Sequence, residues 1–297
     1  MVTSLKHAEP LTAGYRRIAT ECLDTALAAL DTGGDRDAAV HTVRKQCKQL
    51  RALIRLFHTS AAPERRMECR CFRDLGRSLS ALRDARVALD VHGKLIERYR
   101  AVLDPCAGEL VREGLSADLE QKRTAILAAV GDSLPQQLLA ARQRARRLEA
   151  GDEAEKVLQR AFVRSYRRAR RAAGAAAEYG HVEDFHEARK RSKDHWYQLE
   201  FLSQRWPHVT APRIDTTRRL TEVLGDAQDW AVYRAAIERV ANPASTTAAA
   251  LLSAVAASEE RKLQAEALEL FPRVFDVKPK RLADSIGEPD TLHRAVG

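Results

Sequence analysis

The chain has 297 residues, enough for one large domain or two of ordinary size, and 45% of them are hydrophobic, enough for a substantial core. Its 50 Lys and Arg residues outnumber its 41 Asp and Glu residues, which gives a formal net charge of +9. This excess points to a polyanionic partner, such as nucleic acid, an anionic membrane surface or phosphate-rich small molecules. The alternative is a basic surface that serves only solubility.

Two features indicate a cytoplasmic protein. The five cysteines are odd in number and include no C-x-x-C pair, so we expect reduced thiols. The first ten residues lack an apolar signal core, and the longest apolar stretch, 246–257, is too short and too rich in alanine to span a bilayer.

The composition favours helices, because aromatic residues make up only 5% of the chain and no alternating strand pattern or hairpin signal occurs. We therefore expect an all-α fold. In chain order, the expected helices cover residues 11–29, 35–60, 63–99, 116–149, 153–177, 181–206, 213–241 and 245–270.

Glycine, proline and capping residues set the expected boundaries. Gly33 and Gly34 end the first helix, Asp35 caps the second, and Gly180 ends the long helix before 181–206. In the first half we also expect a kink near Asp90 or Gly93, a connection over 103–115 and a break over 131–135. In the second half, helices are expected to stop at Pro207 and Pro212 and again at Asn242 and Pro243, and the tail is expected to be irregular from Pro272.

The stretch from His41 to Phe57 sorts into two faces when wound as a helix. The apolar face holds Val43, Cys47, Leu50, Ile54 and Phe57. The basic face holds His41, Arg44, Lys45, Lys48 and Arg55, with no acid among them. A face of like charges costs free energy unless an anion neutralises it.

The same basic pattern returns 145 residues later. At this shift, the four positions of the second copy are His186, Arg189, Lys190 and Lys193. Leu75, Leu79, Asp84 and Val87 match Leu220, Leu224, Asp229 and Val232 at the same shift. The chain therefore contains an internal repeat, and each half is expected to form a bundle of about four helices.

The duplicated H-x-x-R-[KR]-x-x-[KR] helix, with a downstream L-x-x-x-L-x-x-x-x-D helix in each half, resembles the CHAD family, the conserved histidine α-helical domain. The resemblance covers roughly Leu11 to Leu270 and implies two pseudo-twofold-related four-helix bundles, over 1–150 and 151–275, followed by an irregular tail over 276–297. It also implies a basic central cleft that binds inorganic polyphosphate without catalysis. Gln49 departs from the family, whose first half often has a second basic residue there. No E-x-E-x-K strand of a triphosphate tunnel domain occurs, so we expect a stand-alone module.

The candidate polyphosphate-binding residues combine the motif positions with the basic first helix of each half and the neighbouring basic stripes. The first helices correspond through Tyr15-Arg16-Arg17 and Tyr166-Arg167-Arg168, at a shift of 151 residues. The full set is Tyr15, Arg16, Arg17, His41, Arg44, Lys45, Lys48, Arg51, Arg55, Arg73, Arg77, Arg160, Arg164, Tyr166, Arg167, Arg168, Arg171, His186, Arg189, Lys190 and Lys193.

The chemistry suits a linear phosphate chain, which presents charged oxygens in a row. Arg offers a planar fork for two oxygens and Lys a compact point charge. His41 and His186 could instead be structural histidines without a ligand, or they could be metal ligands. Neither an H-E-x-x-H motif nor an acidic cluster accompanies them, which argues against a metal. Asp84 and Asp229 are expected to fix a neighbouring arginine by an ion pair. Trp196 and Trp230 are expected to be core anchors.

Three functions compete at this stage. Polyphosphate binding, with association to polyphosphate or storage granules, is the first. Nucleic-acid binding is the alternative, although aromatic side chains for base stacking are scarce. A metal-dependent phosphate-processing enzyme is the third, although such chemistry needs carboxylates that hold magnesium beside the phosphates. We expect no catalytic residue, no metal and no cofactor.

Overall fold

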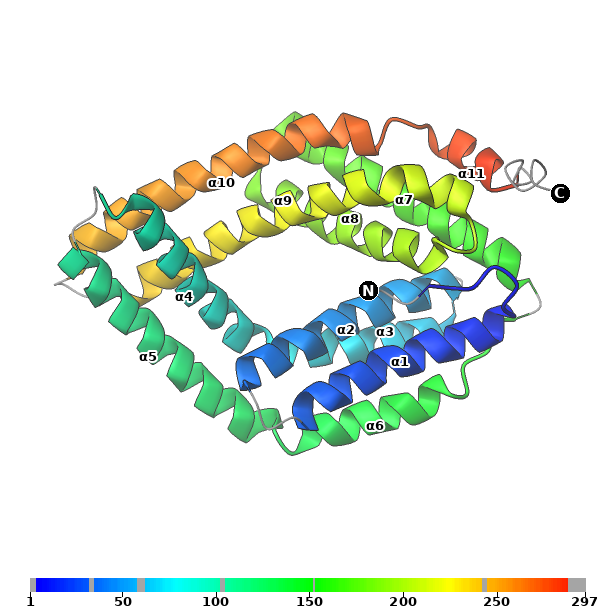
Figure 1. Ribbon diagram of the computed structural model, residues 1–297, viewed down its shortest axis with the longest axis horizontal. Helices are drawn as coiled ribbons and strands as arrows, with labels where there is room; N and C mark the ends of the chain where they lie inside the picture. The colour runs from blue at the N-terminus through cyan, green and yellow to red at the C-terminus, as the bar shows by residue number, and fades with distance from the viewer. Residues whose placement is uncertain are drawn as a thin grey trace.

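All regular structure in the described part of the chain is helical (Figure 1). The computed structural model describes residues 4–31, 35–57, 62–101, 105–151, 153–241 and 245–287. The helices are α1 (Leu11–Asp31), α2 (Arg36–Phe57), α3 (Pro63–Ser78), α4 (Ser80–Tyr99), α5 (Pro105–Val130), α6 (Ser133–Ala145), α7 (Ala154–Tyr179), α8 (Val182–Leu202), α9 (Pro207–Val240), α10 (Thr246–Val274) and α11 (Pro279–Gly287). The predicted all-α class is confirmed.

Local signals explain several helix ends. The side chain of Asp35 accepts a hydrogen bond from the backbone N–H of Asp37 at 2.8 Å, which confirms the predicted cap of α2. Gly180 has a φ of 68°, the left-handed conformation that glycine adopts without steric cost, and it ends α7 as predicted. Gly33, Gly34, Asn242 and Pro243 lie outside the described residues.

The predicted single helix over 63–99 is wrong, because it divides at Leu79 rather than near Asp90 or Gly93. Leu79 has φ −94° and ψ 2° and is fully buried. The hydroxyl of Ser78 donates to the carbonyl of Leu75 at 2.9 Å, and that of Ser80 donates to Arg77 at 2.7 Å. These side chains compete with the helical backbone pattern, which favours a break between the two serines.

Glycine and proline residues interrupt the helices at fewer positions than predicted. Of the predicted connection over 103–115, residues 103 and 104 lie outside the described ranges. Residues 105–115 are helical instead, because α5 begins at Pro105, where the missing N–H costs little. Gly108 allows a close approach to α4, since a Cβ there would lie 2.9 Å from Cδ1 of Ile96. Pro207 begins α9 rather than a loop, and Pro212 lies within it.

The end of the chain is more regular than predicted. Pro272 lies within α10, which continues to Val274. The expected irregular tail over 276–297 is wrong in its described part, since α11 forms and packs on α7 and α9. Leu282 and Ile286 bury one side of this short amphipathic helix, which explains why it folds onto its neighbours.

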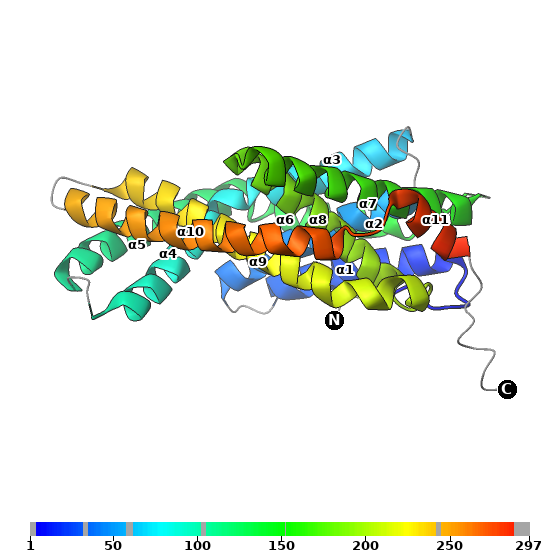
Figure 2. The same cartoon turned by 90° about the horizontal axis from the view of Figure 1, so that it is seen from above.

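The hydrophobic core does not follow the two halves of the chain. The larger cluster draws on α1, α2, α3, α6, α7 and α8, with parts of α9, α10 and α11. A second cluster combines α4 and α5 from the first half with α9 and α10 from the second, through residues such as Leu95, Val111, Tyr233 and Leu252. Figure 2 shows α9 and α10 side by side along the length of the molecule. The pseudo-twofold relation between the halves stays a prediction.

None of the helices in the described ranges combines the length and apolar character that a bilayer span requires. None of the five cysteines, which lie within these ranges, forms a disulfide.

Candidate functional site

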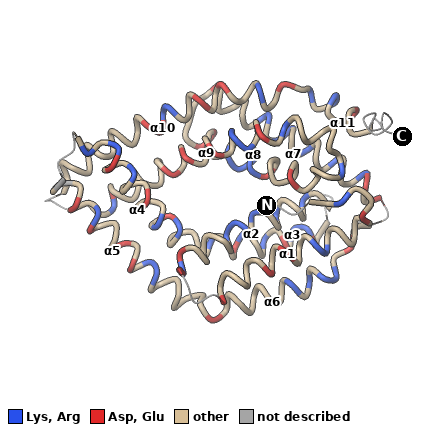
Figure 3. Tube along the Cα trace, viewed as in Figure 1, with Lys and Arg blue, Asp and Glu red and all other residues tan. Residues whose placement is uncertain are grey.

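The two copies of the basic motif meet at the contact between α2 and α8. The apolar residues predicted for α2 are all buried, which turns its basic face towards α8. Lys and Arg positions lie on both helices around the centre of the molecule in Figure 3. We define the central cluster as the cations that α2, α4 and α8 bring together: Arg44, Lys45, Lys48, Arg83, Arg189 and Lys193.

Lys48 lies at the centre of this cluster. Burial lowers its pKa to about 7, and the positive charges of Arg189, Arg44, Arg83 and Lys193 lower it further. No carboxylate opposes this effect among the causes of the shift. Lys48 therefore loses its charge at a much lower pH than an ordinary lysine does.

Lys193 is the corresponding lysine of the second copy. Burial, Arg189 and Lys45 lower its pKa to about 8, whereas Glu222 of α9 acts in the opposite direction. Its ammonium group lies 4.1 Å from the ring centroid of Trp196, a distance at which the ring face stabilises a cation. Trp196 is thus only partly a core anchor, because it also borders the central cluster.

Arg189 makes no hydrogen bond or ion pair with the described residues through its buried Nε. Burial lowers the pKa of this arginine, and the charge of Asp229 opposes the effect. Arg51, one turn beyond Lys48, also has a buried Nε without a partner in the described ranges. A buried cation without a full set of acceptors is costly, and an anion would supply them.

Arg83 belongs to the cluster but the sequence analysis missed it. It lies between two carboxylates, with Asp84 at 3.3 Å and Asp229 at 2.9 Å. The prediction that Asp84 and Asp229 fix a neighbouring arginine by an ion pair is confirmed. The signal in the sequence is its place next to Asp84, since the repeat pairs Arg83 only with the uncharged Gln228 at the shift of 145 residues.

The two motif histidines have equivalent neighbours. Nδ1 of His186 lies 2.7 Å from Oε1 of Gln228. His41 lines a cavity of about 230 Å³ together with Arg83, and its pKa is lowered by burial first and then by Arg83 and the other nearby cations. Neither arrangement resembles a metal site, and the described residues contain no group of three or more His, Cys, Asp and Glu side chains that could hold a metal ion.

Both copies of the motif line one cavity of about 320 Å³. Arg44, Lys48 and Arg51 of α2 lie on one side, and His186 of α8 contributes from the other. Arg73 and Arg77 of α3 line it as well. Arg44 is held in place by donating a hydrogen bond from Nη1 to the carbonyl oxygen of Gly76. The cavity therefore presents cations from α2 and α3 beside the imidazole ring of His186 from α8.

A second basic group lies beside the central cluster, between α2, α3, α7 and α8. It contains Arg55, Arg164 and Arg168 from the predicted set. Arg65 and Arg191 join them, and Asp194 is the acidic member, paired with Arg55. Arg160 is exposed on α7 outside this group, and Lys190 is paired with Glu187 at 2.7 Å.

The predicted role of the tyrosines is wrong. Tyr15 is completely buried and stacks on Phe57, with ring centroids 4.4 Å apart. Tyr166 is buried as well, and its hydroxyl donates to the carbonyl oxygen of Val277 at 2.8 Å. Both side chains anchor their helices in the core, where a ligand cannot reach them.

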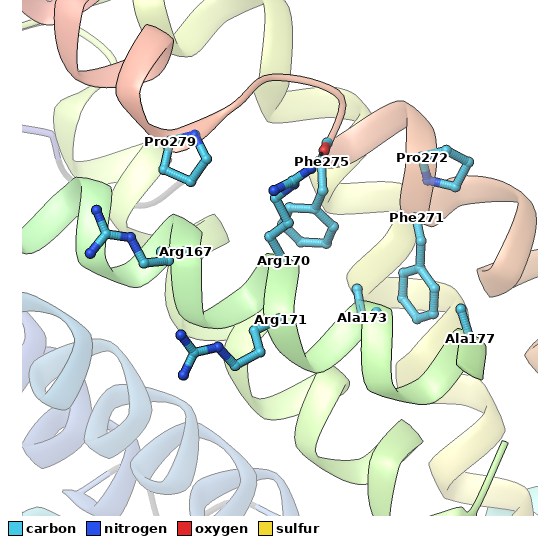
Figure 4. A pocket seen from close by; sticks show the side chains of 10 residues that line it. Arg167, Arg170, Arg171, Ala173, Ala177, Phe271, Pro272, Phe275 and Pro279 are labelled. Atoms are coloured by element: carbon cyan, nitrogen blue, oxygen red, sulfur yellow. Dashed lines mark hydrogen bonds between the residues drawn. The ribbon is translucent and has the colours of Figure 1, made fainter. Parts of the chain in front are cut away.

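The other residues of the first helices are engaged within the chain or lie on another face. Arg16 donates to the carbonyl oxygen of Leu148 at 2.6 Å, and Arg17 forms an ion pair with Glu9 at 2.7 Å. Arg167 and Arg171 line a separate cavity between α7 and the end of α10 (Figure 4). These four arginines do not join the central cluster.

Comparisons with known proteins agree with this architecture. The family model described as CHAD domain matches residues 17–238. A solved structure, described as the crystal structure of the CHAD domain from the plant Ricinus communis, is similar with a TM-score of 0.68 and 17% sequence identity. The similarity covers 94% of this chain and 96% of that one. No curated protein matches the chain. Since the family model covers well over half of the sequence, the chain belongs to the CHAD domain family.

Proposed function

We propose that the protein binds inorganic polyphosphate, without catalysis, through the central cluster. The observation that carries this proposal is the concentration of largely buried cations from both motif copies, which outnumber the nearby carboxylates of Asp84, Asp229 and Glu222. Lys48 has four cationic neighbours, and Arg189 keeps a buried Nε that lacks an acceptor in the described ranges. Family membership favours polyphosphate as the anion that neutralises them, because CHAD domains are associated with polyphosphate.

The arrangement suits a chain of phosphates better than a single ion. Arg44, Lys48, Arg51 and Arg55 follow one another at intervals of three or four residues along α2. They lead from the central cluster to the second basic group. A polymer with one charge per repeat can contact such a row at several points, and each contact releases counterions, so we expect binding to weaken steeply with salt. Association with polyphosphate or storage granules would follow from this binding.

Nucleic acid is the second candidate, since a basic row also fits a phosphodiester backbone. Among the aromatic side chains near the central cluster, Tyr197 and Phe72 are buried and Trp196 is partly buried, so they offer little surface on which bases could stack. A phosphoryl-transfer enzyme is less well supported. Asp84 and Asp229 are engaged by Arg83, whereas magnesium would need free carboxylates beside the phosphates.

The first test replaces cations of the central cluster and measures binding of long-chain polyphosphate by calorimetry at low salt. We expect Arg189→Gln and Arg44→Gln each to weaken binding by about tenfold or more, since each removes charge-assisted hydrogen bonds. Arg218→Gln is the matched control. It removes the same charge from an exposed residue of α9 that is paired with Asp215 at 2.8 Å, and it should change the affinity by less than about twofold.

Two results would contradict the proposal: no binding by the unmodified protein at low salt, or equal losses in Arg189→Gln and Arg218→Gln. Competition separates the alternatives. RNA or DNA that displaces polyphosphate at equal phosphate concentration would favour the nucleic-acid function. Metal-dependent release of phosphate that is lost in His41→Ala or His186→Ala would favour an enzyme.

A further inference from the structure

A further cavity lies away from the central cluster, between α7 and the corner formed by α10 and α11. Its volume is about 540 Å³, within the range of roughly 300–1,000 Å³ that is typical of small-molecule sites. From α7 it is lined by Arg167, Arg170, Arg171, Ala173, Gly174 and Ala177, and from the other side by Phe271, Pro272, Phe275 and Pro279.

The cavity has a cationic edge. Arg167 and Arg171 are exposed and form no hydrogen bond or ion pair with the described part of the chain. Figure 4 shows their guanidinium groups extending to the same side of α7, away from Phe271 and Ala177. No acidic side chain is among the lining residues. This edge is therefore charge-complementary to an anionic group.

The rest of the lining is apolar and held in place. Arg170 donates from Nε to the carbonyl oxygen of Phe275 at 3.1 Å, which fixes the end of α10 against α7. Phe271 and Phe275 line the cavity and are packed into the core, with 5% of each residue exposed. The wall therefore offers apolar surface beside the two free arginines, a combination that a bare polyphosphate chain could not use.

Gly174 contributes the open space. It lies in the middle of α7, where glycine is the least favourable residue after proline. A Cβ at this position would meet no atom within 4 Å. The absence of a side chain therefore keeps the cavity open, and nothing in the packing of α7 requires it.

We propose that this cavity binds a small carboxylate that carries an unbranched apolar chain, of the fatty-acid class. The carboxylate pairs with Arg167 and Arg171, whose planar forks suit two oxygens. The chain lies along Gly174 and Ala177 towards Phe271. This proposal does not depend on polyphosphate binding, because the arginines concerned lie outside the central cluster.

Decanoate tests the proposal, with calorimetry on the full chain as the measurement. We expect saturable binding of decanoate, with decanol and decylamine at least about tenfold weaker because neither offers an anion. Arg171→Gln should weaken decanoate binding by about tenfold. Gly174→Leu should weaken it at least as much, because the new side chain fills the cavity.

Gly93→Leu is the matched control for the glycine variant. Gly93 is an exposed glycine within α4 whose Cβ would also meet nothing within 4 Å, so both variants gain helix propensity and should fold. Gly93→Leu should bind decanoate as the unmodified protein does, and Gly174→Leu should still bind polyphosphate.

Four results would overturn the proposal. They are no binding of decanoate, equal binding of decanol, unchanged binding in Gly174→Leu, and displacement of decanoate by polyphosphate. Binding to anionic lipid vesicles that Gly174→Leu weakens, without binding of free decanoate, would also overturn it, because the surface would then serve a membrane rather than a soluble ligand.

Discussion

Lys48 and Lys193 are unfavourable as cations in the free protein, but a bound anion needs them charged. A buried ammonium group loses hydration, and neighbouring arginines repel it, so the free protein holds Lys48 and Lys193 with pKa values of about 7 and about 8. A bound anion favours their charged forms. Binding must therefore be accompanied by proton uptake wherever these lysines are neutral in the free protein.

This coupling predicts that polyphosphate affinity falls as pH rises from 6 to 9. We expect a loss of at least about tenfold and at most about 1,000-fold, since each lysine that must be protonated contributes up to one decade per pH unit above its pKa in the free protein. His41 adds little in this window, because its pKa is lowered below that of an ordinary histidine. Calorimetry at constant ionic strength measures the trend. Lys48→Arg keeps the charge at all these pH values and should bind with a shallower pH dependence. An equally steep dependence in Lys48→Arg would contradict this account.

The lowered pKa of Lys48 also makes the stability of the free protein depend on pH. Its pKa is lower in the folded than in the unfolded state, so the unfolded state binds more protons between about pH 7 and pH 10 and the free energy of unfolding rises with pH in this window. Lys48→Met removes the buried charge. We expect it to raise the Tm at pH 6 by about 2–5 °C and to flatten the rise with pH in thermal unfolding monitored by circular dichroism. A lower Tm at pH 6 would show that the charge does not destabilise the fold.

Sequence alone located the motif residues but not their surroundings. The repeat identified Arg44, Lys48, Arg189 and Lys193, because like charges at helical spacing with no acid are unusual on a surface helix. Arg83 is absent from the predicted set because its counterpart at the shift of 145 residues is the uncharged Gln228, so the repeat does not mark it as a basic position. Tyr15 was assigned by correspondence with Tyr166, although its spacing from Ile18 and Cys22 already placed it on the buried face of α1.

At the scale of helices, the sequence predicted where helices form better than where they end. Composition and periodicity are summed over many residues, so α1, α2 and α7 lie close to their predicted ranges. The break at Leu79 depends on two serine hydroxyls, and Gly108 in α5 lies close to Ile96 of α4. Such local competition is decided by contacts that the sequence does not reveal.

Gly180 offers a prediction at this scale. Its positive φ is unfavourable for any residue with a Cβ, so Gly180→Ala should lower the free energy of unfolding by about 1 kcal/mol. Gly93→Ala is the control, because Gly93 is helical with open space around it, and that change should stabilise the protein by a similar amount. Urea denaturation measures both. Equal effects of the two substitutions would contradict the role of backbone conformation at Gly180.

For the whole molecule, the mixed hydrophobic clusters predict that the halves of the repeat do not fold independently. A fragment of residues 1–150 would expose Leu95 and Val111, which pack against Tyr233 and Leu252 in the intact chain. We expect this fragment, and likewise 151–297, to lack a cooperative thermal transition, whereas a mixture of the two should recover one. Calorimetry and circular dichroism measure the transition. Cooperative unfolding of 1–150 alone would contradict the prediction and support two autonomous bundles.

The second cluster also constrains how the polypeptide acquires its structure during synthesis. His92 of α4 lies 2.9 Å from the Tyr233 hydroxyl and 3.1 Å from the Gly108 carbonyl, so its environment is complete only when both halves are present. Until the ribosome has released α9 and α10, the nascent α4 and α5 present bare apolar sides to their surroundings. The α4 and α5 helices must consequently complete their folding late. Until then, their exposed apolar surfaces can bind chaperones or aggregate.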